Sequence, residues 1–92
     1  MIKGFRHKGL KALFESGTKK GVPTMLADKI TRRLDALDAA RDPRDLFIPG
    51  FDLHELQGKR KGTWSMSLTG NWRITFRFED EDAFDVDLED YH

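Results

Sequence analysis

A chain of 92 residues is long enough for one modest core and too short to divide, so we expect residues 1–92 to form a single domain. The absence of cysteine from the sequence excludes disulfides and any zinc site built on thiolates. No apolar run approaches the ~20 residues of a membrane span, and the charged N-terminal segment lacks a signal-peptide core. We therefore expect a cytoplasmic protein.

The net charge of zero hides an asymmetry along the chain. All 16 Lys and Arg lie in residues 1–77 beside eight acidic residues, whereas residues 78–92 hold the other eight acidic residues and no Lys or Arg. A basic body attracts a polyanion such as a nucleic acid, and an acidic segment repels it. We expect the acidic segment to fold back and neutralise part of the body, which is compatible with nucleic-acid binding.

The N-terminal quarter favours a strand followed by a helix. Residues 2–6 suit a short strand. Leu10, Leu13 and Phe14 then recur at helical spacing, and Gly17 is placed to end that helix.

A second, amphipathic helix is predicted between two prolines. Pro23 suits the first helical turn, and Asp42-Pro43 closes the helix. One apolar stripe runs along it, and three cations are expected to lie largely off that stripe. The stripe is Leu26, Ile30, Leu34 and Leu37, and the cations are Lys29, Arg32 and Arg33.

From residue 51 the apolar period changes from 3.6 to 2, which predicts three antiparallel strands. Two helices followed by such a meander predict an α+β fold with the helices on one face of the sheet. The alternating sets are Trp64, Met66 and Leu68, then Trp72, Ile74, Phe76 and Phe78, then Phe84, Val86 and Leu88.

Two predicted three-residue loops, 69–71 and 80–82, determine the strand register. The first pairs Leu68 with Trp72 and Met66 with Ile74. The second pairs Phe78 with Phe84, Phe76 with Val86, Ile74 with Leu88 and Trp72 with Asp90, and on the opposite face Arg77 with Asp85 and Arg73 with Glu89.

The histidines are candidate proton-transfer groups, because imidazole titrates near neutral pH. His7, between the first strand and helix, is interpreted as structural. His54 stands at the start of the sheet region, and His92 ends the sequence after Asp90 and Tyr91. A strand that leads up to His92 could hold it in place for catalysis.

Metal binding by His54, Asp90 and His92 is a rival hypothesis, which no local ligand spacing supports, and we expect neither a metal nor another cofactor. Ser65 and Ser67 lack the context of a nucleophilic serine.

Cations are concentrated at two places. Lys59, Arg60 and Lys61 form a glycine-flanked turn that could contact nucleic-acid backbone, or could be a solvated loop. Arg73 lies in a predicted strand, where its side chain is better held than on a loop. The alternative interpretation of Arg73 is a cross-strand pair with Glu89.

These groups suit RNA cleavage that uses the 2′-hydroxyl as the internal nucleophile. Such a reaction needs a base, an acid for the departing 5′-oxygen, and a cation beside the charged phosphorane. Histidine, arginine and aspartate can supply these roles, and Tyr91 could stack on a base or hydrogen-bond to it.

Three segments are distinctive in combination: Leu56-Gln57-Gly58-Lys59-Arg60-Lys61-Gly62-Thr63-Trp64-Ser65, Asn71-Trp72-Arg73-Ile74-Thr75-Phe76 and the terminal Asp90-Tyr91-His92. Together they resemble the HigB-like toxins of the RelE/ParE superfamily, and the opening ten residues look similar too.

The resemblance implies a microbial-RNase-like fold, with two helices packed on a mainly antiparallel sheet, in a single toxin domain. It implies a ribosome-dependent endoribonuclease that cuts mRNA in the ribosomal A site. A helix-turn-helix, HigA-like antitoxin would neutralise it, and the pair would bind operator DNA through the antitoxin. Carried over by position, the active-site set is His54, Arg73, Asp90, Tyr91 and His92.

The sequence departs from the family pattern at Gln57, where a relative has a lysine that contributes to the site. Phosphate stabilisation would then depend more on Arg73 and on Lys59 or Arg60. Two alternatives stay open: a non-enzymatic, ParE-like inhibitor of DNA gyrase, and an attenuated toxin that acts mainly as a co-repressor. The presence of His54 and His92 argues against the gyrase inhibitor.

Overall fold

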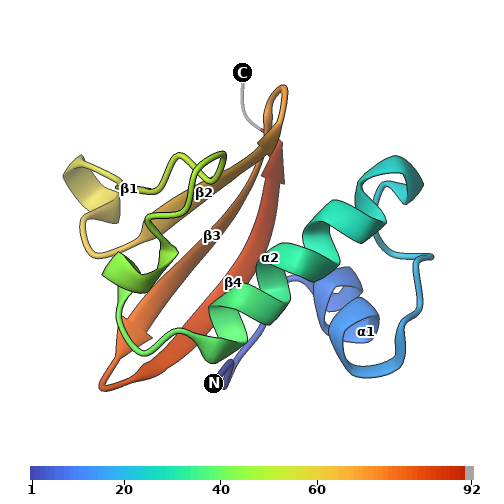
Figure 1. Ribbon diagram of the computed structural model, residues 1–92, viewed down its shortest axis with the longest axis horizontal. Coiled ribbons are helices and arrows are strands. Elements are labelled where there is room, and N and C mark those ends of the chain that lie inside the picture. The colour runs from blue at the N-terminus through green and yellow to red at the C-terminus, as the bar shows by residue number, and fades with distance from the viewer. Residues whose placement is uncertain (91–92) are drawn as a thin grey trace.

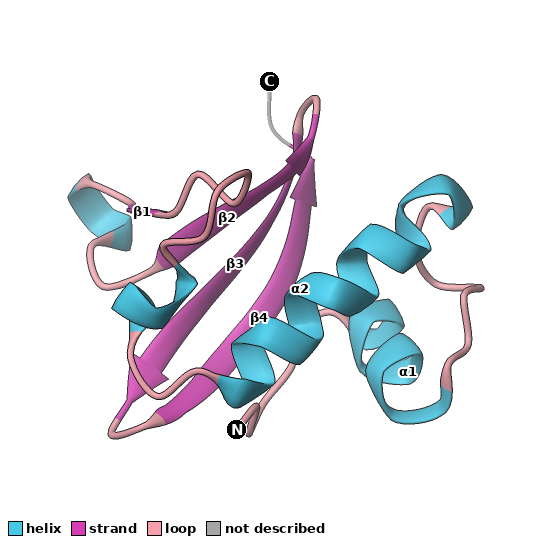
Figure 2. Ribbon diagram, in the orientation of Figure 1, coloured by secondary structure: helices cyan, strands magenta, loops and turns pink. Residues whose placement is uncertain are grey.

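The computed structural model describes residues 1–90, which form a layer of helices against one four-stranded antiparallel sheet (Figure 1). Figure 2 shows the helices and the sheet as separate layers. This arrangement confirms the predicted α+β class. The strands are β1 (His54–Glu55), β2 (Trp64–Thr69), β3 (Trp72–Glu79) and β4 (Asp82–Asp90), and they lie in the order β1-β2-β3-β4. The helices are α1 (Lys8–Ser16) and α2 (Ala27–Ala39). Three short 3₁₀ turns connect these elements: η1 (Thr24–Leu26), η2 (Pro43–Leu46) and η3 (Gly58–Arg60).

Helix α1 begins and ends at residues with capping geometry. The Nδ1 atom of His7 accepts a hydrogen bond of 3.1 Å from the backbone N–H of Leu10, so the structural role expected for His7 is confirmed. At the other end Gly17 adopts a left-handed φ of 75° and its N–H donates to the carbonyl of Leu13. The predicted glycine stop is therefore also confirmed.

Helix α2 buries Ile30, Leu34 and Leu37 of the predicted stripe, whereas Leu26 lies in η1 and is half-buried. The prediction placed one cation wrongly. Arg33 is buried rather than off the stripe, with 7% of its surface exposed. Its Nε donates to the carbonyl of Ser67 and its Nη2 to the carbonyl of Gly50, while its guanidinium lies 4.3 Å from the centre of the Phe51 ring. Periodicity misses such a residue because a long side chain can bury its stem and still satisfy its polar head at two carbonyls.

Residues 2–6 do not form the continuous strand that was predicted. Ile2 and Phe5 instead make isolated parallel bridges to Ala83 and Val86 of β4. Backbone bonds join the two segments, among them Lys3 N–H to the carbonyl of Ala83 at 2.8 Å. The N-terminal segment thus runs beside β4 without becoming a full member of the sheet.

Between β2 and β3 the predicted pair of Met66 and Ile74 is confirmed. The predicted pair of Leu68 and Trp72 is wrong, because Trp72 pairs with Thr69. A two-residue turn at 70–71 replaces the expected three-residue loop, and an irregularity at Leu68 restores the apolar alternation.

Between β3 and β4 the register is right at one end and wrong at the other. The pairs Trp72–Asp90, Arg73–Glu89 and Ile74–Leu88 are confirmed. Past a bulge, one residue of β3 opposes two of β4, and Asp85 takes a positive φ of 54°. The bulge makes two predicted pairs wrong, Phe78–Phe84 and Arg77–Asp85, since Phe78 pairs with Ala83 and Arg77 with Phe84. The predicted partners Phe76 and Val86 lie within the bulge itself.

The core lies between the helices and the sheet face that carries the alternating apolar residues. The largest fully buried apolar side chains come from α1, α2, η2 and the three long strands: Leu10, Ile30, Leu34, Leu37, Leu46, Met66, Ile74, Phe76 and Val86.

Among the described residues, no helix is both long and apolar enough to cross a membrane.

Candidate active site

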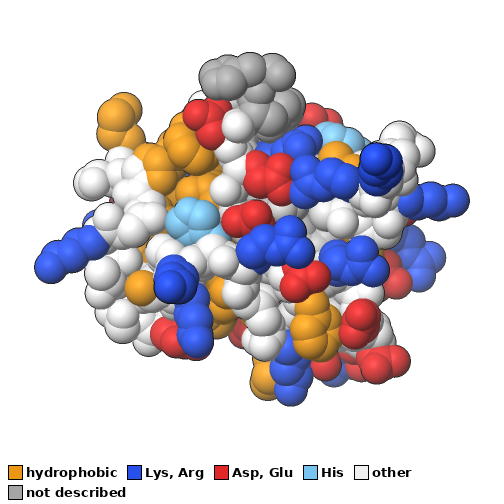
Figure 3. Space-filling view, turned by 180° about the vertical axis from the view of Figure 1, so that it is seen from behind, with side chains coloured by type: hydrophobic (Ala, Val, Ile, Leu, Met, Phe, Trp, Pro, Cys, Tyr) orange, Lys and Arg blue, Asp and Glu red, His pale blue; other side chains and the backbone are white. Residues whose placement is uncertain are grey.

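The candidate site lies on the sheet face that points away from the helices, here called the outer face. Residues paired across neighbouring strands point to the same side of a sheet. Figure 3 views the molecule from behind Figure 1, and on that side cationic and anionic side chains are intermixed. Two registered rows cross the outer face: His54, Ser65, Thr75 and Asp87 form one, and Ser67, Arg73 and Glu89 form the other.

His54 is exposed on β1 with one ring nitrogen engaged. Its Nδ1 lies 3.1 Å from the carbonyl oxygen of Asp52. A carbonyl only accepts, so this hydrogen bond needs the proton on Nδ1, and the neutral ring then carries its lone pair on Nε2. An imidazole in that state can take a proton from a hydroxyl group.

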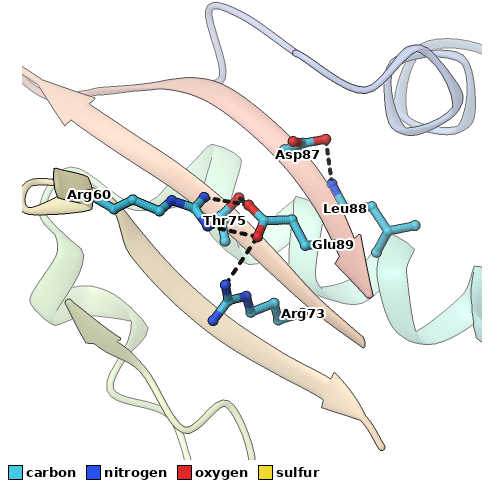
Figure 4. A network of polar contacts seen from close by, with 6 residues as sticks. All are labelled: Arg60, Arg73, Thr75, Asp87, Leu88 and Glu89. Carbon is cyan, nitrogen blue, oxygen red and sulfur yellow. Dashed lines mark hydrogen bonds and ion pairs between the residues drawn. The ribbon is translucent and has the colours of Figure 1, made fainter. Parts of the chain in front are cut away.

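Glu89 is the centre of a polar network on the outer face (Figure 4). Its Oε1 accepts from Nη1 of Arg60 at 2.9 Å and from Nη2 of Arg73 at 3.1 Å. Its Oε2 accepts from Nη2 of Arg60 at 2.5 Å and from the hydroxyl of Thr75 at 2.7 Å. The carboxylate therefore receives four hydrogen bonds from η3 and β3, which uses about all of its acceptor capacity.

These donors determine the charge state of the network. The bond from Arg60 is the largest cause that lowers the pKa of Glu89 to about 2, with Thr75 and Arg73 contributing and burial opposing. The same bond raises the pKa of Arg60. Glu89 is thus ionised at neutral pH and saturated with donors, so it is not a candidate base.

The two groups of predicted cations behave differently in the structure. The cross-strand pair of Arg73 and Glu89, weighed as an alternative for Arg73, is present. In the basic turn Lys59 and Lys61 are exposed, whereas Arg60 folds back onto β4. The acidic segment therefore neutralises part of the basic body, as expected. Gln57, which precedes η3, is also exposed.

Three predicted site residues lie at the end of the chain. Asp90, the last described residue, is exposed and pairs with Trp72 in the predicted register. Tyr91 and His92 lie outside the described residues. The structure thus brings His54 and Arg73 onto one face, with strand β2 between their strands. Asp90 ends β4 beside Glu89, but by strand parity it belongs to the opposite face, which also carries Trp72 and Leu88.

Sequence reasoning missed the central role of Glu89 and the part played by Thr75. Thr75 and Ser65 are 2% and 1% exposed although they belong to the outer face, and within residues 1–90 the Ser65 hydroxyl has no hydrogen-bond partner. The predicted register already set Arg73 opposite Glu89. It gave no sign that Arg60, 29 residues away, would join them.

The rival metal hypothesis involved residues at both ends of the sheet. Within residues 1–90 no group of three His, Asp or Glu side chains is arranged to hold a metal ion. His92, the third ligand in that hypothesis, lies outside this range.

Comparison with known proteins gives a consistent result over nearly the whole sequence. A family model described as RelE-like toxin of type II toxin–antitoxin system HigB matches residues 3–92. A Proteus vulgaris protein named Endoribonuclease HigB is 49% identical over 92 residues, with all of both chains covered. Toxin HigB-1 of Vibrio cholerae serotype O1 is 30% identical over 87 residues, which cover 92% of each chain.

Proposed function

This chain belongs to the RelE-like HigB toxins of type II toxin–antitoxin systems, and from that membership we propose that it is an endoribonuclease that cleaves mRNA in the A site of the translating ribosome. The name of the Proteus vulgaris relative supports the nuclease activity. The observation that carries the mechanism is the placement of His54 and Arg73 on one outer face of the sheet.

His54 is the proposed base. Its Nδ1–H is held by the carbonyl of Asp52, which leaves Nε2 to take the proton of the 2′-hydroxyl. The 2′-oxygen then forms a bond to the adjacent phosphorus. General acid–base catalysis of this kind contributes about 10²–10⁴ in rate.

Arg73 is the proposed electrostatic partner of the phosphorane. Its side chain is 14% exposed and held by Glu89, so it has little freedom to reorganise as negative charge develops. When the bond to the 5′-oxygen breaks, that oxygen needs a proton. By the family resemblance we assign this proton to His92, with Asp90 and Tyr91 completing the set.

The open form of the site supports dependence on the ribosome. His54 is exposed on a sheet face and Arg60 is 42% exposed, and the structure of residues 1–90 has no pocket that would enclose an RNA strand. The ribosome would supply the missing alignment by holding mRNA in its decoding site, and alignment can be worth more than proton transfer itself. The exposed Lys59 and Lys61, with Arg60, are proposed contacts to nucleic-acid backbone.

Membership in a type II system implies an antitoxin partner. We propose that this antitoxin is a helix-turn-helix, HigA-like protein, that the complex binds operator DNA through it, and that the single toxin domain acts in the cytoplasm.

The decisive experiment is induction in cells with mapping of mRNA 5′ ends, for the wild type, His54→Ala and His92→Ala. New ends within translated codons should appear with the wild type and disappear with either variant. Purified protein should cut mRNA on programmed ribosomes and leave the same RNA intact without them. Growth arrest without new 5′ ends would favour a gyrase inhibitor, and equal cleavage of free RNA would contradict ribosome dependence.

A further inference from the structure

The network around Glu89 joins two cations that are far apart in sequence. Arg60 comes from η3, between β1 and β2, and reaches over the outer face to β4. Arg73 comes from β3, beside β4. Both donate to the same oxygen, Oε1, at 2.9 and 3.1 Å, so the two donating nitrogens are no more than about 6 Å apart (Figure 4).

Two guanidinium groups at this separation repel each other unless an anion lies between them. The Glu89 carboxylate offsets that repulsion and forms a two-bonded fork with Arg60, which is the strongest geometry for an arginine–carboxylate pair. Thr75 donates to the same carboxylate from beneath, at 2.7 Å, and is itself 2% exposed. Three side chains, Arg60, Arg73 and Thr75, therefore hold Glu89 in place.

The network mixes charges of both signs. Glu89 accepts two N–H donors of Arg60 and one of Arg73, and Asp87, paired with Thr75 on the same face, adds a second negative charge that acts on Arg60. The arrangement thus orients both arginines beside the strand that leads to Asp90.

We propose that Glu89 is a positioning residue that holds Arg60 beside Arg73, so that two guanidinium groups act on the scissile phosphate. The inference rests on the proposed nuclease function. It gives Arg60 a role separate from that of Lys59 and Lys61, which are exposed in the same turn.

The test compares Glu89→Gln and Arg60→Gln with the matched control Arg44→Gln. Arg44 also lies in a 3₁₀ turn, η2, and also forms a pair with a carboxylate, Asp42. Each arginine variant removes one cation from one such pair. Single-turnover cleavage of mRNA on programmed ribosomes is measured against protein concentration, with thermal unfolding of every variant alongside.

The maximal rate should fall about tenfold or more for Glu89→Gln and for Arg60→Gln, as expected for loss of an oriented donor to a transition-state charge. The half-saturating concentration should change little, and the rates are compared at a temperature at which every variant remains folded. The double variant should be no slower than the slower single variant, because both changes disrupt the same pair of Arg60 and Glu89. Arg60→Lys should restore only part of the rate, since it keeps the charge and loses the fork.

Three outcomes overturn the proposal. The Glu89→Gln and Arg60→Gln variants could have the same maximal rate as Arg44→Gln, or they could change only the half-saturating protein concentration. Their rates could also fall only in proportion to the fraction of unfolded protein. Arg60→Gln changes a partly exposed turn, so it stays informative if Glu89→Gln does not fold. If the wild-type protein leaves ribosome-bound mRNA intact, the proposed function itself is contradicted. If the wild type cleaves and the variants cleave equally fast, only the role of Glu89 and Arg60 is contradicted.

Discussion

Gly9 in the first turn of α1 lies directly against Gly21 in the loop that leads to α2. A Cβ atom at Gly9 would stand 2.1 Å from the carbonyl oxygen of Gly21, and a Cβ at Gly21 would stand 2.6 Å from the Cα of Gly9. The two backbones thus meet at a distance that no side chain permits. The contact joins the start of one helix to the approach of the next.

Gly9→Ala should destabilise the protein by about 1–3 kcal/mol, because overpacking against backbone exceeds the modest helix propensity gained. Chemical unfolding followed by circular dichroism measures the change. Gly4→Ala is the matched control, since a Cβ there would meet its nearest atom, Cδ1 of Phe84, at 3.8 Å. Equal stability of both variants would show that the loop at Gly21 moves to make room for the added Cβ atom at little cost.

The ion-pair network predicts an acid-dependent loss of stability. The pKa of Glu89 is about 2 in the folded protein against an ordinary value of 4.5. A depressed pKa adds stability that is complete above about pH 4.5 and is lost as pH falls towards 2. Glu89→Gln should remove on the order of 1–2 kcal/mol at pH 7 after allowance for screening at Arg60. The gap in melting temperature between wild type and variant should then narrow towards pH 2. A constant gap from pH 7 to pH 2 would refute this.

Lys59 and Lys61 should contribute to ribosome binding through charge alone. Replacing both by Gln should weaken binding and reduce the slope of log K against log salt by up to about 2, since each phosphate contact contributes about 0.7–0.9. Lys19 and Lys20, exposed after α1, make a matched control pair. If both double variants have the same salt slope, the basic turn is a solvated loop.

Deletion of His92 should abolish toxicity and preserve the fold. The buried stripe of β4 ends at Leu88, and Asp90 is already exposed, so we expect the deletion to cost little apolar packing. A proton-transfer group contributes about 10²–10⁴ in rate, enough to separate growth arrest from growth. The variant should still bind antitoxin and melt near the wild-type temperature. A deletion variant that stays toxic would remove His92 from the proposed mechanism.

The helices, the sheet order and part of the register could be predicted because each depends on local periodicity. The stop at Gly17 and the pair of Arg73 and Glu89 follow from spacing alone. The bulge at Asp85 could not be predicted, because an extra residue in one strand leaves the apolar pattern almost intact while shifting every pair beyond it.

The sequence predicted which residues belong to the candidate site, but it predicted only part of how they are arranged in space. His54 and Arg73 do share a face, as strand parity permits. The reach of Arg60 across two strands depends on a long side chain and on the conformation of η3, and neither leaves a periodic signal. The roles of His54, Arg73, Asp90, Tyr91 and His92 stay predictions until the variants are measured.

The N-terminal segment beside β4 bears on aggregation. A long edge strand is a template for strand addition by another chain. The first half of the outer edge of β4 is occupied by backbone bonds to residues 1–6, such as Val86 N–H to the carbonyl of Gly4 at 3.1 Å. The second half carries Asp87 and Asp90, whose carboxylates oppose pairing with an identical edge, whereas the charge of Glu89 is paired with Arg60 and Arg73. The opening residues thus cover the first half of the edge, so their removal would both expose a template for strand addition and take away Ile2 and Phe5, which pack against the core.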